Sequence, residues 1–245
     1  RRQRQMCIRD SNSMLAKEAE QRKNDLIVYL AHDLKTPLTS VIGYLTLLED
    51  EPDIPKKTRE KYTSIALNKA ERLEDLINEF FDITRFNLTN IELDIEKVNL
   101  SRMLEQICSE FLPILSEHKL SWNLDIAPDI NLMCDPDKLS RVFDNLIRNA
   151  VNYSYPDTEI TCVLTKQDKD IHILFKNHGK TISPEKLSRV FEQFFRLDSS
   201  RASSTGGAGL GLAIAKEIVE LHGGQINAAS ENESISFEVV FRNDL

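Results

Sequence analysis

The chain has 245 residues, 41% of them hydrophobic and 29% charged, which is typical of a folded globular protein and leaves room for two domains. The formal net charge of −8 argues against a nucleic-acid-binding protein, which normally presents a basic surface. The four cysteines are scattered and include no Cys-x-x-Cys pair, so we expect free thiols and neither a disulfide framework nor a zinc site.

The beginning of the chain is open to two interpretations. No run reaches the roughly 18 to 20 apolar residues of a membrane span. The basic start, Arg1-Arg2-Gln3-Arg4, fits either the cytoplasmic flank of a membrane helix or an ordinary charged helix start. We take residues 1–22 as a membrane-proximal linker.

The first predicted elements are two long amphipathic helices. Apolar residues recur at three- and four-residue steps from about Asn12 to Glu51, and again in a second run that ends near Arg85. Pro52 and Pro55 are too close together to lie inside one helix, so we expect a short turn and an antiparallel hairpin. One hairpin cannot bury both apolar stripes. We therefore expect a homodimer in which two hairpins form a four-helix bundle.

After residue 86 short β-rich runs alternate with helical stretches. Strands are predicted at Ile91–Val98, Leu120–Ile126, Ile130–Cys134, Glu159–Thr165, Ile171–Lys176, Gln225–Ala229 and Ile235–Phe241. Helices are predicted at Leu100–His118, Pro136–Tyr153, Pro184–Phe195 and Gly209–His222. This pattern indicates an α/β sandwich with helices on one face. The predicted domains are residues 23–88, the helical dimerisation domain, and residues 89–245, the α/β domain.

The first chemical motif surrounds His32, which lies between apolar positions of the first helix. A lone histidine there is more often structural, but its neighbours change that interpretation. Asp33 can accept a proton from the imidazole and keep one ring nitrogen nucleophilic. Lys35 and Thr36 follow on the same helix face, and Pro37 breaks the backbone ladder at a cost of about 3 kcal/mol that a purely structural role does not explain.

Two further motifs suit a phosphorylated ligand. Asn145 and Asn149 share a helix face, and their neutral amide oxygens can complete the shell of a Mg²⁺ whose charge phosphates balance. The glycine-rich run Gly206–Gly211 leads into a helix whose N-terminus can bind phosphate, and no Walker lysine follows it. The polar stretch Arg196–Thr205 resembles a mobile lid, with Arg196 and Arg201 available for phosphate charge.

In this order and spacing the motifs resemble the H, N, G1 and G2 boxes of bacterial sensor histidine kinases. The G1 counterpart is Asn177-His178-Gly179-Lys180-Thr181, and Phe191–Arg196 resembles the F box. The resemblance runs from about Lys23 to Phe241. It implies a dimerisation domain followed by an ATP-binding α/β sandwich of the histidine-kinase and Hsp90-like type. It also implies a response regulator as partner and a position on the cytoplasmic side of a bacterial cell membrane.

The resemblance also implies roles for single residues. His32 would receive the γ-phosphoryl group of ATP with Asp33 as its base partner, and Thr36 matches the position that orients water for dephosphorylating the response regulator. Asn149 would hold Mg²⁺. The implied nucleotide-binding residues are Asn145, Asn149, Tyr153, Asn177, Gly179, Arg196, Gly207, Gly209, Leu210 and Gly211.

Departures from the family pattern predict weaker ATP binding without loss of activity. Asn177 replaces the usual Asp, Thr181 replaces the second glycine of the G1 box, and Asn152 replaces a frequent Lys or His. Related ATPases carry a glutamate at the place of Asn145, and because an amide cannot act as a general base, Asn145 favours a kinase over an ATPase. The alternatives are an ATPase of the same fold and a non-catalytic dimer that binds nucleotide or a response regulator as a switch.

Overall fold

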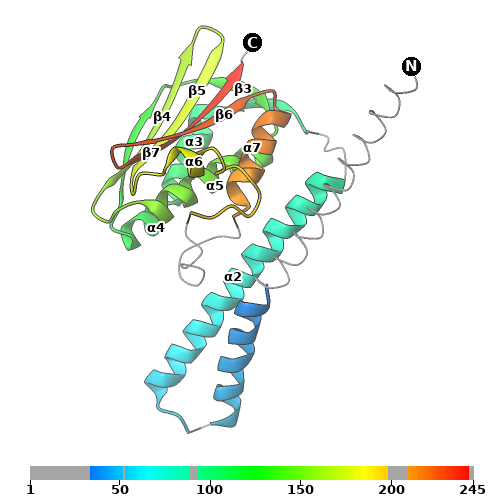
Figure 1. Cartoon of the computed structure of the whole chain (residues 1–245), viewed down its shortest axis with the longest axis vertical. Coiled ribbons are helices and arrows are strands. Elements are labelled where there is room, and N and C mark those ends of the chain that lie inside the picture. Colours follow the sequence, from blue (N-terminus) through cyan, green and yellow to red (C-terminus); the bar gives the residue numbers. More distant parts are fainter. Residues whose placement is uncertain (1–33, 52, 89–92, 198–208, 243–245) are drawn as a thin grey trace, which may run out of the picture. The chain divides into compact units, whose positions relative to one another are not determined.

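The computed structural model describes residues 34–51, 53–88, 93–197 and 209–242 (Figure 1). The chain divides into two units, Arg1–Asp82 and Ile83–Leu245. None of the helices within the described ranges combines the length and apolar character that a membrane span requires.

The first unit contains the predicted helical hairpin except for the last residues of its second helix. One helix covers residues 34–50, and α2 (Lys56–Leu88) follows a short turn. The turn ends where the carbonyl of Pro55 accepts hydrogen bonds from the backbone N–H groups of Thr58 and Arg59. The two helices contact each other through the rings of Tyr44 and Tyr62, whose centroids are 5.4 Å apart.

Only part of the apolar surface of this hairpin is covered. Ala66 and Leu76 are buried, at 5% and 3% exposure. Large apolar side chains on both helices stay open to solvent: Leu38, Ile42, Leu45, Leu47, Leu67 and Ile77 are 37–57% exposed. The described part of the hairpin thus presents an exposed apolar surface, which is typical of a protein–protein contact.

The second unit is built on a five-stranded mixed sheet of order β2-β4-β5-β7-β6. Its strands are β2 (Ser121–Ile126), β4 (Glu159–Gln167), β5 (Asp170–His178), β6 (Gln225–Glu231) and β7 (Ser234–Arg242). The β2–β4 pair is parallel and the other pairs are antiparallel. A separate two-stranded antiparallel sheet joins β1 (Glu96–Asn99) to β3 (Asn131–Cys134).

Helices cover one face of the large sheet. Burial alternates along β4 and β5, because Ile160, Cys162, Ile173 and Phe175 point to the core while their neighbours face the other side. The covering helices are α3 (Leu100–Glu110), α5 (Pro136–Tyr153) and α7 (Gly211–Leu221), which contact β2, β5 and β6 respectively (Figure 1). This is the predicted α/β sandwich.

Two predicted helices differ from the structure. Residues 100–118 form two helices, α3 and α4 (Leu112–Glu117), because Pro113 has no N–H to donate to the turn before it. Residues 184–195 form only the short α6 (Pro184–Leu187), followed by turns. Phe194 has a φ of +64°, which no α-helix contains.

Candidate nucleotide site

The candidate site follows one face of α5. The carboxylate of Asp135 caps this helix by accepting the backbone N–H of Lys138 at 3.0 Å, and Pro136 occupies its first turn. Asn145, Asn149 and Tyr153 are spaced four residues apart and therefore share a face. From Asn145 to Tyr153 the helix rises about 12 Å. That length suits a ligand extended along the helix.

At one end of this face, α5 meets the start of α7. Gly211 lies so close to Asn145 that a Cβ on it would be 2.9 Å from the Asn145 Oδ1 atom. The Nδ2 atom of Asn145 is buried and has no hydrogen-bond partner among the described residues. Leu210 is fully buried and precedes α7 without a side-chain cap, so the first N–H groups of α7 remain available to a bound anion.

At the other end, α5 meets the end of β5. Gly179 follows β5, and a Cβ on it would be 2.1 Å from the Tyr153 carbonyl oxygen. Asn177 is 1% exposed, and its Nδ2 atom also lacks a hydrogen-bond partner among the described residues. A buried amide donor without an acceptor is costly, so this atom is suited to a ligand or water that enters the site. The sequence motifs around Asn145 and Asn177 thus lie at opposite ends of one helix face.

The segment after α6 is joined to Gly209, the first described residue of the glycine-rich run. The backbone N–H of Phe194 donates to the Gly209 carbonyl at 2.9 Å, and Gly209 has a φ of +77°, which favours glycine. Phe191 packs edge-on against Phe237, with centroids 6.2 Å apart. The hydrogen bond and the ring contact hold this segment in place just before the predicted lid.

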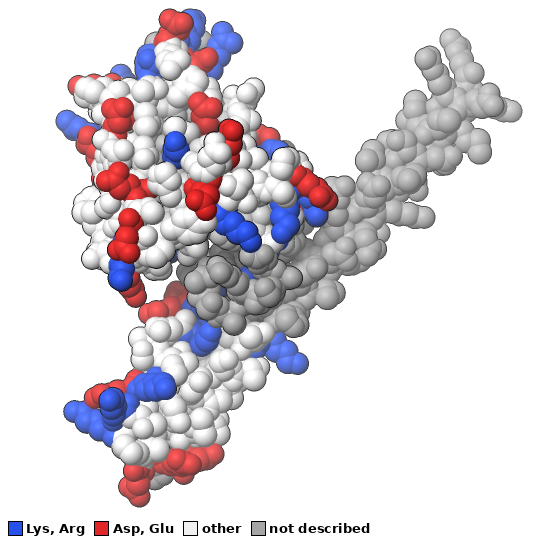
Figure 2. Space-filling view, turned by 60° about the vertical axis from the view of Figure 1, so that its left-hand side comes forward, with Lys and Arg blue, Asp and Glu red and all other residues white. Residues whose placement is uncertain are grey.

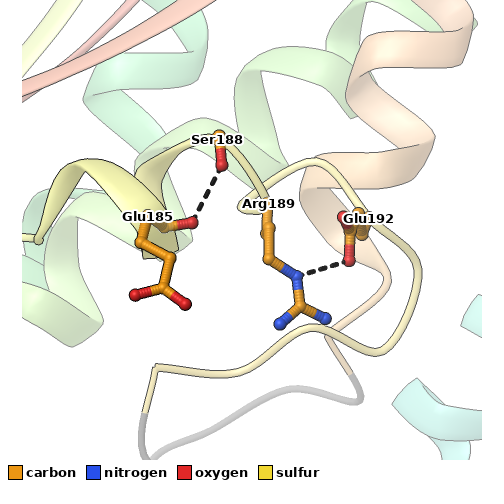
Figure 3. Close-up of polar contacts among 4 residues, drawn as sticks. All are labelled: Glu185, Ser188, Arg189 and Glu192. Carbon is orange, nitrogen blue, oxygen red and sulfur yellow. Dashed lines mark hydrogen bonds and ion pairs between the residues drawn. The ribbon is translucent and has the colours of Figure 1, made fainter.

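The turns after α6 are also held together by local polar contacts (Figure 3). Ser188 Oγ donates to the Glu185 carbonyl at 2.8 Å, and the Nε atom of Arg189 donates to a Glu192 carboxylate oxygen at 2.9 Å. The Arg189 guanidinium lies 4.8 Å from the centroid of the Phe195 ring. Arg196, the predicted phosphate contact, follows directly and is half-buried.

Several predicted site residues lie outside the described residues. His32, Asp33, Arg201 and Gly207 belong to this group, so their roles stay predictions. Thr36 is described: it is exposed on the helix of residues 34–50, and its carbonyl accepts the Ser40 hydroxyl at 3.1 Å. Asn152 is exposed at the end of α5.

His222 has a role that sequence reasoning missed. Its position at a helix end suggests a cation near the dipole, but its Nδ1 atom lies 2.8 Å from the Ile218 carbonyl and its Nε2 atom lies 3.0 Å from the Asp135 backbone nitrogen. The first contact requires a donor and the second an acceptor, so the geometry fits the neutral imidazole. His222 therefore ties the end of α7 to the start of α5. A partner 87 residues away in sequence gives no local signal.

Burial and hydrogen bonding shift the pKa values of several ionisable groups in the second unit. Burial of Asp135 opposes its ionisation, but hydrogen bonds from the backbone N–H groups of Lys138 and Asp94 outweigh it and lower the pKa of its carboxyl. Burial, with the nearby charges of Asp135 and Glu96, raises the pKa of the Cys134 thiol to about 12. A hydrogen bond between the thiols of the fully buried Cys108 and Cys162 raises the pKa of Cys162, and burial adds to it.

Within the described ranges no three His, Cys, Asp or Glu side chains come together as a metal site. A cation bound beside α5 would therefore depend on ligand phosphates as well as on Asn149. Acidic and basic side chains are interspersed on the face of the second unit shown in Figure 2. This distribution differs from the basic face of a nucleic-acid-binding protein.

Known families match most of the chain. Residues 22–88 match the family described as the His Kinase A (phospho-acceptor) domain. Residues 134–244 match the histidine kinase-, DNA gyrase B- and HSP90-like ATPase family. The sensor histidine kinase YcbM of Bacillus subtilis is 30% identical over an alignment that covers 87% of this chain and 69% of YcbM. The chain belongs to the sensor histidine kinases.

Two members of this family are more similar in sequence. The sensor protein VanSC of Enterococcus gallinarum is 60% identical, and the sensor protein VanS of Enterococcus faecium is 51% identical, each over 91% of this chain. The chain spans 62% and 58% of the lengths of these two relatives. These matches confirm the predicted family, and the ATPase-family match makes the second unit an ATP-binding domain.

Solved histidine kinases share the fold. The histidine kinase AdeS of Acinetobacter baumannii is 22% identical and superposes with a TM-score of 0.71 over 87% of this chain and 98% of AdeS. The histidine kinase ThkA, solved in complex with the response regulator TrrA, is 20% identical with a TM-score of 0.73 over 93% of this chain and 64% of that chain. These similarities confirm the predicted fold class.

Proposed function

We propose that this chain is the catalytic part of a sensor histidine kinase that phosphorylates His32 from ATP and passes the phosphoryl group to an aspartate of a response regulator. The observation that carries the proposal is the pair of buried amide nitrogens of Asn145 and Asn177, which have no hydrogen-bond partner among the described residues and lie at opposite ends of the α5 face. One end adjoins the N-terminus of α7, which suits phosphate. The other end is closed by Gly179 and Tyr153, which suits a base.

The reaction needs little covalent chemistry from the ATP-binding domain. Phosphoryl transfer depends mainly on positioning and on charge stabilisation. A ring nitrogen of His32 attacks the γ-phosphorus, a nitrogen–phosphorus bond forms, and ADP leaves as the bond to the β-phosphate oxygen breaks. The other ring nitrogen keeps its proton and donates a hydrogen bond to the Asp33 carboxylate, which orients the imidazole and stabilises the positive charge that forms on it. Asn145 cannot activate water, because its amide is not a base, and this supports transfer to histidine over hydrolysis.

Mg²⁺ is part of the proposal. Asn149 is half-buried between Asn145 and Tyr153 on the α5 face, and its neutral amide oxygen suits Mg²⁺ once phosphates balance the charge. The bound ion would neutralise charge that develops on the phosphate oxygens. Arg196 would add charge from the segment that follows α6.

The partners follow from the first unit and from the relatives. The exposed apolar side chains of the hairpin, among them Ile42 and Leu67, support a homodimer with a four-helix bundle. The similarity to VanS and VanSC supports a VanR-like response regulator, signalling in glycopeptide-antibiotic resistance, and a place on the cytoplasmic side of a membrane protein. Thr36, exposed on its helix, would orient water for dephosphorylation of the regulator.

The test is labelling with γ-³²P-ATP and Mg²⁺, with His32→Gln beside the wild type. We expect label that survives alkali, is lost in acid and is absent from the variant. Wild-type chain that binds ATP without becoming labelled would contradict the kinase proposal and favour a nucleotide-binding switch. Release of phosphate that does not depend on His32 would favour the ATPase.

A further inference from the structure

In the turn between β6 and β7, Glu233 adopts a positive φ angle that is unfavourable for glutamate. Asn232 and Glu233 form a two-residue turn, and both have positive φ angles, +50° and +57°. A hairpin turn of this type requires positive φ at both residues, and asparagine or glycine normally supplies it. Glutamate has no such preference, so its backbone is strained unless other contacts hold it.

Glu233 makes such contacts with three residues next to the nucleotide site. Its backbone N–H donates to the Thr181 hydroxyl oxygen at 2.9 Å. Its carbonyl accepts the backbone N–H of Gly179 at 2.9 Å. One of its carboxylate oxygens accepts the Tyr155 hydroxyl at 3.2 Å.

One further hydrogen bond joins the residue after Thr181 to the same hairpin. The backbone N–H of Ile182 donates to the Ser230 hydroxyl oxygen of β6 at 2.9 Å. Residues 179–182 are therefore attached to the β6–β7 hairpin at both ends. Gly179 is pressed at the same time against the Tyr153 carbonyl of α5, and a Cβ added to Gly179 would lie 3.4 Å from Asn177 Nδ2.

We propose that Thr181 and Glu233 are positioning residues for ATP, which hold residues 179–182 against the β6–β7 hairpin and so fix Asn177 and Gly179 at the base-binding end of the site. This inference rests on the proposed function. Thr181 stands where the family pattern has a glycine, and a glycine has no side-chain oxygen to accept the Glu233 N–H as Thr181 does. The replacement thus closes the loop onto the hairpin.

The test uses the whole 245-residue chain and three variants of similar size. Thr181→Val removes the acceptor and keeps the branched shape, while Thr181→Ser keeps the hydroxyl. Thr165→Val is the matched control, because Thr165 pairs with His172 near the start of β5, whereas the hairpin turn adjoins His178 at its end. Binding of a non-hydrolysable ATP analogue is measured by calorimetry. Amide hydrogen exchange at Gly179 and Glu233 is measured without nucleotide.

We expect Thr181→Val to weaken analogue binding about five-fold, the effect of one net hydrogen bond, with both control variants within about two-fold of wild type. In Thr181→Val the amides of Glu233 and Gly179 should exchange faster. The KM for ATP in autophosphorylation should rise with kcat unchanged, because the contact acts equally on ground and transition states.

The possible failures are distinguishable. Wild-type chain that binds no ATP analogue would overturn the proposed function and this assignment with it. Wild-type binding together with unchanged affinity and unchanged amide exchange in Thr181→Val would overturn the positioning role alone. An equal loss in Thr181→Ser would show that the hydroxyl is not the holding group, which also contradicts the proposal.

Discussion

Replacing Gly179 by alanine tests the contact between the end of β5 and the end of α5. The added Cβ would lie 2.1 Å from the Tyr153 carbonyl oxygen, whereas real Cβ contacts essentially never fall below 3.0 Å, so one backbone must move by about 0.9 Å. Both backbones carry residues of the proposed site, and neither is the flexible end of a side chain. Overpacking of this kind lowers the free energy of unfolding by about 1–3 kcal/mol.

A displacement near 1 Å should harm ATP use more than it harms stability. We expect ATP-dependent labelling of Gly179→Ala to fall on the order of ten- to a hundred-fold, while thermal unfolding shows a chain that still folds. Gly223→Ala is the control, because Gly223 also strains an alanine, with a φ of +71°, but no atom lies within 4 Å of its added Cβ. Labelling and analogue affinity at wild-type levels in Gly179→Ala would refute the reasoning.

Four other predictions address separate parts of the account. Asn149→Ala should raise the Mg²⁺ concentration for half-maximal labelling by about ten- to a hundred-fold, and an unchanged requirement would remove Asn149 from the cation site. Asp135→Asn should lower the free energy of unfolding at pH 7, because the wild-type carboxyl has a lowered pKa. The stabilisation by the wild-type carboxylate is complete above the ordinary Asp pKa of about 4 and is lost as the pH falls further. Denaturation curves of the two proteins should therefore converge at low pH. In a Cys7→Ser background, Cys134 should resist a thiol reagent at pH 8 in the folded chain, because its pKa is raised to about 12, and should react on unfolding. Ile42→Asp should convert a dimer to a monomer in light scattering, because Ile42 is 56% exposed on the open apolar face; a wild-type monomer would contradict the bundle.

Helix caps, prolines and hydrophobic periodicity made much of the fold predictable from the sequence. The turn before Lys56 follows from two prolines, and α5 begins and ends where its cap, its proline and its periodicity predict. The β5 and β7 strands exceed their predicted ranges by one or two residues because pairing extends beyond the apolar run. These elements depend on short-range signals that the chain carries.

The errors lie where tertiary packing overrides a local pattern. The aromatic run around Phe191 has helical spacing, yet Phe191 packs on Phe237 and Phe194 binds Gly209, so the chain turns. The contact of His222 Nε2 with the Asp135 backbone nitrogen joins residues far apart in the sequence. The motifs predict candidate site residues on α5, and their roles stay predictions. They could not show that Gly179 lies against Tyr153, or that two buried amide nitrogens have no partner among the described residues, since both facts arise only on folding.

The most direct test of the central claim is to locate the phosphoryl group. After incubation with Mg·ATP, the chain is digested under alkaline conditions, which preserve phosphohistidine, and the peptides are examined by mass spectrometry. We predict one phosphoryl group on the peptide that contains His32, and none on that peptide in Asn149→Ala at low Mg²⁺. A phosphoryl group on another residue, or none on a chain shown to bind ATP, would contradict the account.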